Sequence, residues 1–378
     1  MTDLARDPVF GEVARRLSPL ALPARASVAP TRPPPAVGGL AGWVEVSFRT
    51  GGLGTDELAR LAAVSKSLLP TATGSGRDVL GCPRFVLEQP ELATPAVAAL
   101  LAAHERANLP FGRLRLMGVV NVTPDSFSDG GEHLDPSRAV ARALALVAEG
   151  ADLLDIGGES TRPGSDPVSV EEELRRVVPV ITELAKLTRI PISTDTRRAA
   201  VARAALEAGA TIVNDVSAGL ADAAMLAVVA KHKASFVAMH MQGEPRTMQT
   251  APRYDEVVAE VANFLRERCF RALEAGIARH RLWIDPGIGF GKTLEHNLEL
   301  LRRLPELRSL GLPILLGVSR KSFIPKITGV DTPPEQRIGG TAAAVTLGVL
   351  GGAEILRVHD VAVMREAALV ARAIGIPG

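Results

Sequence analysis

From about residue 113 onward, short apolar runs alternate with longer amphipathic stretches along the chain. Eight of these runs have the length and composition of buried strands, and each is followed by a stretch with helical periodicity. They read LRLMGVV, DLLDIG, PISTD, TIVND, SFVAMH, LWIDPG, PILLGVS and EILRVHD. Eight strand–helix pairs within roughly 260 residues predict an α/β fold of the (β/α)8 barrel type, which typically needs about 250 residues. A doubly wound parallel sheet is the alternative arrangement of the same elements.

Helix boundaries in this region carry recognisable capping residues. Asp135 is placed to cap the first helix, Pro136 suits its first turn, and Gly150 ends it. The spacing of Ser169 and Glu172 is that of a capping box, so a second helix is expected to begin there. On the first helix, one apolar face is expected to carry Val140, Leu144 and Val147.

The first 112 residues follow a different pattern. A helix and a proline-rich linker are expected over residues 1–37, with the linker at ARASVAPTRPPPAV, residues 24–37. Residues 38–108 predict a small α/β domain, in which WVEVSFR and RFVLE are strands and TDELARLAAVSKSLL and TPAVAALLAAHER are helices. This stretch shows no catalytic cluster, and the barrel is expected to occupy residues 113–376.

Composition places the chain among soluble globular proteins, because 47% of its residues are hydrophobic and 22% are charged. The formal net charge is +1, so no bulk field favours nucleic acid. No apolar stretch reaches the roughly 18 residues of a membrane span, and the N-terminal residues lack the pattern of a secretory signal. Cys82 and Cys269 form no metal-binding spacing and indicate a reducing compartment, so a cytoplasmic location is expected.

Polar side chains stand at or just after the carboxyl end of nearly every predicted strand. They are Asn121, Glu159, Asp195, Asn214, His240, Asp285, Ser319 and His359. In an eight-stranded barrel all these ends lie on one face, which is the face where active sites are found. A single polar strand end means little, since strands must meet loops, but eight of them predict a lined pocket.

Several of these residues have ordinary alternatives. Asp195 would serve as the cap of a helix beginning near Arg197, and Asn214 and Asp215 would serve as turn residues. Asp285 opens a D-P-G turn signal. The functional alternative is that two carboxylates and an amide converge on a flat heterocycle with several N–H donors. A partly desolvated site then selects its ligand, because an unpaired polar edge is costly there.

The glycine-rich segment GIGFGKT, Gly287–Thr293, is similar to a phosphate-binding loop but fails its spacing. The loop needs a glycine five residues before Gly291, and that position is Pro286. No carboxylate context for a metal–nucleotide complex accompanies the segment. Nucleotide hydrolysis is therefore not expected.

Cationic residues follow two of the last strands. Arg357 with His359 predicts an anion clamp, because a guanidinium binds phosphate through two parallel hydrogen bonds. Arg320 and His240 are expected to have structural roles. Cys269 lies in the middle of a helical stretch, and no Ser-His-Asp or activated cysteine arrangement is present, so covalent catalysis is not expected.

Eight motifs, taken in order, resemble those of the dihydropteroate synthase family. They read NVTPDSFSDGG, DIGGESTRPGS, STDT, IVNDVS, MHMQG, IDPGIGFGK, GVSRKSFI and LRVHDV. The resemblance spans about residues 113–376 and does not cover the first 112. It implies a pterin-binding TIM-barrel transferase of folate biosynthesis. Such an enzyme joins 6-hydroxymethyl-7,8-dihydropterin pyrophosphate to p-aminobenzoate and releases 7,8-dihydropteroate and pyrophosphate.

The same resemblance assigns residues to each part of the site. Those for the pterin are Asp195, Asn214, Met239, Asp285, Gly317 and Lys321. Those for the diphosphate are Asn121, Thr161, Arg162, Arg357 and His359. Those for p-aminobenzoate are Thr161, Pro163, Phe290 and Ser319. Those given catalytic roles are Asp155, Arg162 and Lys321. The resemblance further implies Mg²⁺ held by Asn121 and the diphosphate, small-molecule partners, and a homodimer formed through barrel helices.

The implied chemistry suits these residue types. Loss of pyrophosphate leaves a cation on the pterin, so the leaving group needs charge neutralisation by Mg²⁺, Arg357 and His359. Ionised Asp195 and Asp285 can stabilise the positive charge on the ring. The nucleophile is a weakly basic aniline nitrogen, so its orientation as two loops close matters more than a strong base.

Two other functions are compatible with a pterin-binding barrel. A methyltetrahydrofolate:corrinoid methyltransferase binds no diphosphate, and the SRK, RVHD and NVTPDSFSDGG segments argue against it. A non-catalytic pterin-binding paralogue is expected to have lost part of the set formed by Asn121, Arg162, Lys321 and His359, and all four are present.

Overall fold

A computed structural model describes residues 114–123, 136–160, 168–244 and 247–375, together with four short strands nearer the N-terminus. The chain divides into two compact units. One contains residues 1–112, 256–263 and 303–311, and the other contains residues 113–255, 264–302 and 312–378. Among the described residues, no helix is both long enough and apolar enough to pass through a bilayer.

The second unit contains an eight-stranded parallel sheet that closes on itself. Its strands are β5 (Arg115–Asn121), β6 (Leu153–Gly157), β7 (Ile192–Asp195), β8 (Ile212–Asp215), β9 (Ser235–Met239), β10 (Leu282–Asp285), β11 (Leu315–Leu316) and β12 (Ile355–Val358). The spatial order is β10-β9-β8-β7-β6-β5-β12-β11. A parallel bridge between Ile284 and Ile314 joins the two ends of this order. The structure therefore confirms the (β/α)8 barrel, and the doubly wound sheet is wrong because that sheet has open edges.

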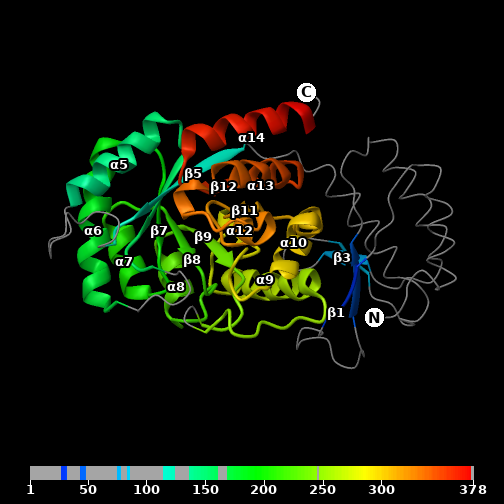
Figure 1. Ribbon diagram of the computed structural model, residues 1–378. Helices are drawn as coiled ribbons and strands as arrows, with labels where there is room; N and C mark the ends of the chain where they lie inside the picture. Colours follow the sequence, from blue (N-terminus) through cyan, green and yellow to red (C-terminus); the bar gives the residue numbers. More distant parts are fainter. Residues whose placement is uncertain are drawn as a thin grey trace, which may run out of the picture. The chain divides into compact units, whose positions relative to one another are not determined.

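Helices follow the strands and cover the outside of the barrel (Figure 1). They are α5 (Pro136–Ala148), α6 (Val170–Leu187), α7 (Ala199–Glu207), α8 (Met225–Lys231), α9 (Val257–Glu274), α10 (Leu294–Arg302), α12 (Phe323–Thr328), α13 (Ile338–Leu350) and α14 (Val361–Gly375). The short helix α11 (Leu304–Leu307) and the first residues of α9 belong to the first unit. Helices α5 to α8 succeed one another around one side, and α13 and α14 lie side by side.

The cap predicted for α6 is confirmed, whereas the apolar face predicted for α5 needs correction. Ser169 caps α6, since its Oγ accepts a hydrogen bond from the Glu172 N–H at 3.1 Å. On α5 the buried face consists of Ala139, Val140, Ala143 and Leu146. Leu144 and Val147 are only half-buried. The prediction that they lie on the buried face with Val140 is therefore wrong for these two residues. The helix is held in this rotation by Leu146, whose Cδ1 would be 3.1 Å from a Cβ at Gly118 of β5. The expected cap Asp135 lies outside the described residues.

A layer of large apolar side chains fills the barrel interior. It consists of Met117, Leu153, Ile212, Val237, Trp283, Leu315 and Ile355. Because side chains on a strand alternate between its two faces, the residue two positions further along also points inward. These next residues are Val119, Asp155, Asn214, Met239, Asp285, Gly317 and Arg357. The period of the strands therefore places Asp155, Asn214, Asp285 and Arg357 directly above the apolar layer, at the carboxyl ends.

The four N-terminal strands form two antiparallel pairs, β1 (Ser27–Thr31) with β2 (Trp43–Ser47) and β3 (Ser75–Arg77) with β4 (Pro83–Phe85). Strand β2 falls on the expected run WVEVSFR, and β4 overlaps the expected run RFVLE at Arg84 and Phe85. Strand β1 lies inside the segment expected to be a linker. Among the described strands β1 pairs only with β2, and an edge position of this kind tolerates Pro30. The helices and domain role expected for residues 1–112 lie outside the described residues.

Candidate active site

A cavity of about 390 Å³ opens at the carboxyl ends of the barrel strands. Its lining includes Asn121, Glu159, Asp195, Phe290, Ser319, Lys321, Arg357 and His359. A narrow cleft of about 20 Å³ adjoins it and is lined by Asp195, Asn214, Met239, Asp285, Phe290, Gly317, Lys321 and Arg357, among others. The structure thus brings together nearly all the residues singled out in the sequence. Thr161, Arg162 and Pro163 lie outside the described residues.

Arg357 of β12 is the centre of a charge cluster inside the barrel. Its Nε donates to Asp155 Oδ2 at 2.6 Å, and its Nη2 donates to Asp195 Oδ2 at 2.7 Å. Asn214 Nδ2 donates to the same Asp155 oxygen at 3.0 Å. Burial alone would lower the pKa of Arg357, but Asp155 and Asp195 raise it, so the guanidinium keeps its charge. Arg357, expected on the diphosphate, is here held by two carboxylates.

Asp195 is buried at the mouth of the barrel, and its protonation is unusual. Burial raises the pKa of this carboxyl to about 7, against the opposing charge of Arg357 and with the help of Asp155. A carboxyl poised near neutrality can pair with a cationic ligand when ionised and donate a hydrogen bond when protonated. The cluster therefore adapts to the charge of what enters the cleft.

The alternative role of Asp195 as a helix cap is wrong. Helix α7 begins at Ala199, and its N-cap Arg198 provides no side-chain cap. The Ala199 N–H donates instead to Asp222 Oδ2 at 2.8 Å, an acid from the next βα connection. Asp195 is therefore available to the cleft.

Asn214 and Asp215 have different roles, one as a site residue and the other as a turn residue. Asp215 is the turn residue, because its carboxylate accepts from the Ser217 N–H and Oγ at 2.7 Å each and from the Gly219 N–H at 2.8 Å. Asn214 is not a turn residue, since its side chain points inward to Asp155. Its buried Oδ1 has no hydrogen-bond partner among the described residues. That oxygen is suited to accept from a ligand N–H.

Asp285 combines both of its possible roles. Its Oδ1 accepts from the Gly287 N–H at 2.7 Å, which is the expected turn contact. Its Oδ2 would be 3.9 Å from a Cβ at Gly317, so this oxygen faces the space that the glycine leaves open. Burial raises the pKa of Asp285, while the Gly287 hydrogen bond and the charge of Lys321 oppose that shift.

Lys321 and Phe290 form one wall shared by the cavity and the cleft. The Lys321 ammonium lies 4.1 Å from the centroid of the Phe290 ring, which is within the range of a cation–π interaction. Gly289 supports the stem of this lysine, because a Cβ there would lie 3.3 Å from Lys321 Cδ. The wall therefore presents a positive charge above a flat apolar ring.

His359 and Ser319 stand together in the cavity lining. The Ser319 Oγ lies 3.0 Å from His359 Nδ1 and accepts from the His359 N–H at 3.2 Å. Arg320, expected to be structural, donates to both carboxylate oxygens of Asp360, at 3.0 and 2.6 Å. This bidentate pair confirms that Arg320 is engaged within the protein, although it also borders the cavity.

Asn121 ends β5 beside a gap left by glycine. A Cβ at Gly157 would lie 3.9 Å from Asn121 Oδ1 and 3.7 Å from Asp195 Oδ2, so these two oxygens share the space beside it. No group of three or more His, Cys, Asp or Glu side chains among the described residues could hold a metal ion. A cation at Asn121 therefore requires further oxygens from a substrate, which is the usual way in which Mg²⁺ is bound beside phosphates.

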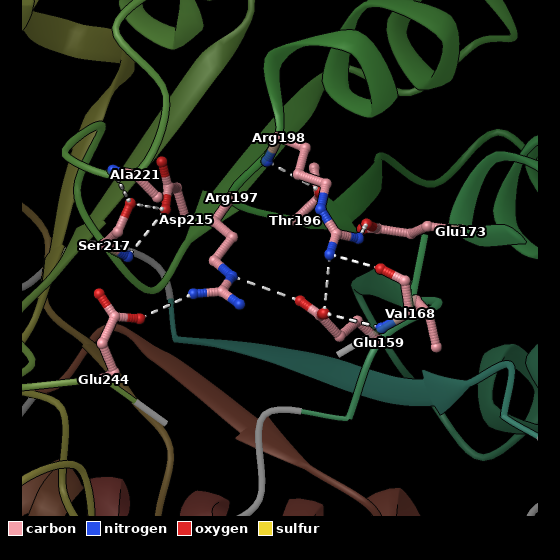
Figure 2. A network of polar contacts seen from close by, with 10 residues as sticks. All are labelled: Glu159, Val168, Glu173, Thr196, Arg197, Arg198, Asp215, Ser217, Ala221 and Glu244. Atoms are coloured by element: carbon pink, nitrogen blue, oxygen red, sulfur yellow. Dashed lines mark hydrogen bonds and ion pairs between the residues drawn. The ribbon is translucent and has the colours of Figure 1, made fainter. Parts of the chain in front are cut away.

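Glu159, expected at the pocket, is held by two arginines that sequence reasoning did not single out (Figure 2). Arg197 Nε donates to Glu159 Oε2 at 3.4 Å, and Arg198 Nη2 donates to Glu159 Oε1 at 3.0 Å. Arg198 also pairs with the buried Glu173 of α6. Arg197 reaches Glu244 after β9 at 3.2 Å. The network therefore ties together the segments that follow β6, β7 and β9.

Arg198 additionally joins two points of the chain on either side of the connection after β6. Its Nη2 donates to the Val168 carbonyl at 2.6 Å, and the Val168 N–H donates to Glu159 Oε1 at 3.3 Å (Figure 2). The only sequence signal for this role was the adjacent pair of arginines just before α7.

His240 is structural, as expected, and does not line the cavity. It packs edge-on against Phe264 at 4.9 Å between ring centroids, and its Nδ1 lies 2.9 Å from Lys292 Nζ. Burial, followed by the charge of Lys292, lowers the pKa of His240 to about 2, so the imidazole is neutral. The buried Lys292 was missed from the sequence, where it belonged to the rejected GIGFGKT pattern.

Comparison with known proteins places these features in a family. Residues 117–359 match the family described as "Pterin binding enzyme". The dihydropteroate synthase of Synechocystis sp. is 48% identical over 263 residues, which cover 69% of this chain and 90% of that protein. The dihydropteroate synthase of Escherichia coli strain K12 is 45% identical over 266 residues, which cover 70% of this chain and 93% of that protein.

Solved structures give the same relationship. The dihydropteroate synthase of Xanthomonas albilineans with 4-aminobenzoic acid superposes with a TM-score of 0.66 and 52% identity, covering 71% of this chain and 95% of that chain. The enzyme from the same organism in complex with 7,8-dihydropteroate gives a TM-score of 0.64 and 48% identity, covering 72% of this chain and 99% of that chain.

Proposed function

The chain belongs to the family of pterin-binding enzymes and has the function of a dihydropteroate synthase in folate biosynthesis; we propose that its reaction takes place in the cavity and cleft at the barrel mouth. The CH₂ carbon of 6-hydroxymethyl-7,8-dihydropterin pyrophosphate forms a bond to the amine nitrogen of p-aminobenzoate. The bond from that carbon to the pyrophosphate oxygen breaks, and the amine loses a proton. The products are 7,8-dihydropteroate and pyrophosphate.

The cleft is the pterin site in this proposal. Asn214 Oδ1 and Asp285 Oδ2 accept hydrogen bonds from the ring N–H groups, and Gly317 leaves room for the flat ring. Asp155, expected to be catalytic, touches Arg357 and Asn214, so we assign it the task of orienting these two side chains. Ionised Asp195 and Asp285 stabilise positive charge on the pterin as the pyrophosphate departs.

The diphosphate occupies the cavity beside the cleft, next to Arg357, His359 and Lys321. Cationic groups aimed at the leaving oxygen lower the barrier because negative charge develops there. Asn121 would hold Mg²⁺ together with oxygens of the diphosphate, and the bound ion would add further charge neutralisation. The roles expected for Thr161 and Arg162 stay predictions.

The amine substrate lies against the wall formed by Phe290 and Lys321, with Ser319 nearby. The flat ring of p-aminobenzoate stacks on a flat apolar surface, and its carboxylate is attracted by the ammonium. An aniline nitrogen is only weakly basic, so holding it in line with the CH₂ carbon supplies most of the rate gain.

The observation that carries this proposal is the cluster of Arg357, Asp155, Asp195 and Asn214 at the base of a cavity on the carboxyl face. The test is pyrophosphate release, measured with the pterin diphosphate, Mg²⁺ and p-aminobenzoate and with each omitted in turn. Release that depends on all three is expected. Absence of amine-dependent product would instead support a methyltransferase or a non-catalytic pterin-binding protein.

We further propose that the enzyme is a homodimer that associates through α13 and α14. Leu347, Leu350, Val370 and Ile374 are large apolar side chains on these neighbouring helices, with exposed fractions of 58%, 47%, 54% and 78%. Clustered exposed apolar side chains favour association. Sedimentation analysis of the protein and of a Leu347→Glu/Val370→Glu double variant tests this, with a dimer and a monomer as the respective expected results. A monomeric parent protein would refute it.

We also propose a cytoplasmic location, which is supported by the low cysteine count and by the lack of a metal-type spacing of Cys82 and Cys269. Cell fractionation tests this directly. Recovery of the protein with the membranes or outside the cell would contradict it.

A further inference from the structure

The loop after β10 is packed unusually closely against the segment after β9. Gly287 and Gly291 have φ angles of +66° and +59°. A Cβ at Gly287 would lie 1.9 Å from the His240 carbonyl oxygen, and one at Gly291 would lie 2.2 Å from the Gln242 carbonyl oxygen. Only glycine fits at these two points, so the loop backbone rests directly on another backbone.

Lys292, at the end of this loop, is buried with an exposed fraction of 2%. Its Nζ lies 2.9 Å from the Phe290 carbonyl oxygen, 3.0 Å from the Gly287 carbonyl oxygen and 2.9 Å from His240 Nδ1. The His240 carbonyl oxygen is a fourth neighbour of Nζ, at 3.3 Å. The imidazole nitrogen accepts when the ring is neutral with its proton on Nε2, so the three N–H donors of an ammonium are shared among four acceptors. Burial lowers the pKa of Lys292 to about 7, and the charge of Asp285 opposes that shift.

The backbone groups that point into this loop are the opposite of those in a phosphate-binding loop. There, amide N–H groups point inward at an anion. Here, the carbonyl oxygens of Gly287 and Phe290 point inward at a cation that belongs to the protein. A fixed internal ammonium therefore organises this glycine-rich turn from within.

Other side chains hold the same loop at different atoms. Asn297 Oδ1 of α10 accepts from the Gly289 N–H at 2.7 Å, and the Tyr254 hydroxyl donates to the Gly291 carbonyl at 2.7 Å. Lys292 differs from them because it binds the carbonyl of Phe290 itself. Its contact therefore bears directly on where the Phe290 ring points.

We propose that Lys292 is a positioning residue, whose buried ammonium holds the Gly287 and Phe290 carbonyls and so sets the Phe290 ring beneath Lys321 for the amine substrate. Lys292 lines neither the cavity nor the cleft, so it acts through Phe290. Phe290 lies at the border of both spaces, and its ring is 4.1 Å from the Lys321 ammonium. The identity of the amine as p-aminobenzoate rests on the proposed function.

The experiment compares Lys292→Met and Lys292→Gln with the parent protein. Methionine keeps the length of the side chain without donors, and glutamine restores an N–H₂ group without charge. Lys231→Met, at an exposed lysine at the end of α8, is the matched control. Activity of the parent protein is measured first, so failure of the proposed function is seen there and not confused with failure of this inference.

Lys292→Met is expected to raise KM for p-aminobenzoate about tenfold, the loss expected from one or two buried hydrogen bonds, with Lys292→Gln in between. Affinity for the pterin diphosphate, measured by calorimetry, should stay within about twofold of the parent value. Amide exchange should quicken in residues 287–293 and not in β5 to β8. If Lys292→Met does not fold, Lys292→Gln must show the same result, a raised KM for p-aminobenzoate with nearly unchanged affinity for the pterin diphosphate.

Two results would overturn the inference. One is an unchanged KM for p-aminobenzoate in a folded Lys292 variant. The other is an equal loss of both substrates together with faster exchange throughout the barrel, which would make Lys292 a purely structural residue.

Discussion

Two clusters of acids and arginines stand at the barrel mouth. They differ in whether an unpaired side-chain oxygen borders the cleft. In the inner cluster, Arg357 holds Asp155 and Asp195, yet Asp155 Oδ1 and Asn214 Oδ1 are buried without a partner among the described residues. In the outer cluster, both oxygens of Glu159 are engaged by Arg197 and Arg198 (Figure 2). Glu173 Oε1 of the outer cluster is also buried without a partner among the described residues, but Glu173 borders neither the cavity nor the cleft, whereas Asn214 borders the cleft. An unpaired buried oxygen is costly unless a ligand satisfies it, so the inner cluster is the one placed for binding and the outer one holds loops.

The position of the two clusters follows from a single strand. Asp155 lies within β6, where its side chain points into the barrel, whereas Glu159 follows the strand and meets the arginines before α7. Asp155 and Glu159 are only four positions apart, yet the first lies inside the barrel and the second lies among the segments that follow the strands. The difference can be tested by removing the arginine of each cluster and by changing the ionisation of the inner acids.

The largest effect is expected from Arg357→Met. This substitution leaves Asp155 and Asp195 buried without a cation, and breaking a buried ion pair costs about 3 kcal/mol or more. Urea unfolding should show this loss, and activity should disappear with it. A loss no greater than that of the outer arginine variant below would contradict the distinction between the clusters.

Substitution of the pterin-facing charges should follow in size. Lys321→Ala and Asp285→Asn are each expected to weaken binding of the pterin diphosphate about a hundredfold, as measured by calorimetry, because each removes a charged hydrogen-bonding group from the cleft. Asparagine keeps a carbonyl oxygen for the Gly287 N–H, so the turn should survive. Lys326→Ala, at an exposed position on α12, serves as the control. Near-normal turnover in either site variant would remove that residue from the site.

A smaller effect is expected in the pH dependence of stability. Burial raises the pKa of Asp195 in the folded chain to about 7 from 3.8, so the folded state binds this proton more tightly than the unfolded state. The stabilisation that this group contributes is complete below about pH 4 and is lost as the pH rises towards about 7. The unfolding free energy should therefore fall across this range more steeply in the parent protein than in Asp195→Asn. Parallel pH profiles would show that Asp195 is not the group responsible.

The smallest of these effects is expected from Arg197→Met in the outer cluster. Because Arg197 is partly exposed, Glu159 keeps Arg198 and Glu244 is exposed, the loss in unfolding free energy should be about 1 kcal/mol. Pterin affinity should be unchanged. Arg175→Met, which removes an exposed pair with Glu172, should have almost no effect and calibrates the measurement. A hundredfold loss of pterin affinity in Arg197→Met would place the outer cluster in the binding site.

Most of the fold was readable in the sequence. All eight apolar runs are strands, and the residues two positions after the inner apolar residues line the cavity or the cleft, with the exception of Asp155, because a strand repeats every second residue. The α5 face was misjudged because Leu144 and Val147 match the helical period as well as Ala143 and Leu146 do. Contact with Gly118 of β5 decides between the two faces, and no local pattern contains that contact.

The sequence by itself determined which elements form, their order and which polar residues reach the carboxyl face, because these depend on short-range periodicity and on the closure of eight strands. Only the tertiary structure decided how those residues pair. Arg357 meets Asp155 and Asp195 across 202 and 162 residues, and Lys292 meets His240 across 52. Such pairs are selected by burial, since a charge removed from water must find a partner wherever the fold brings one near.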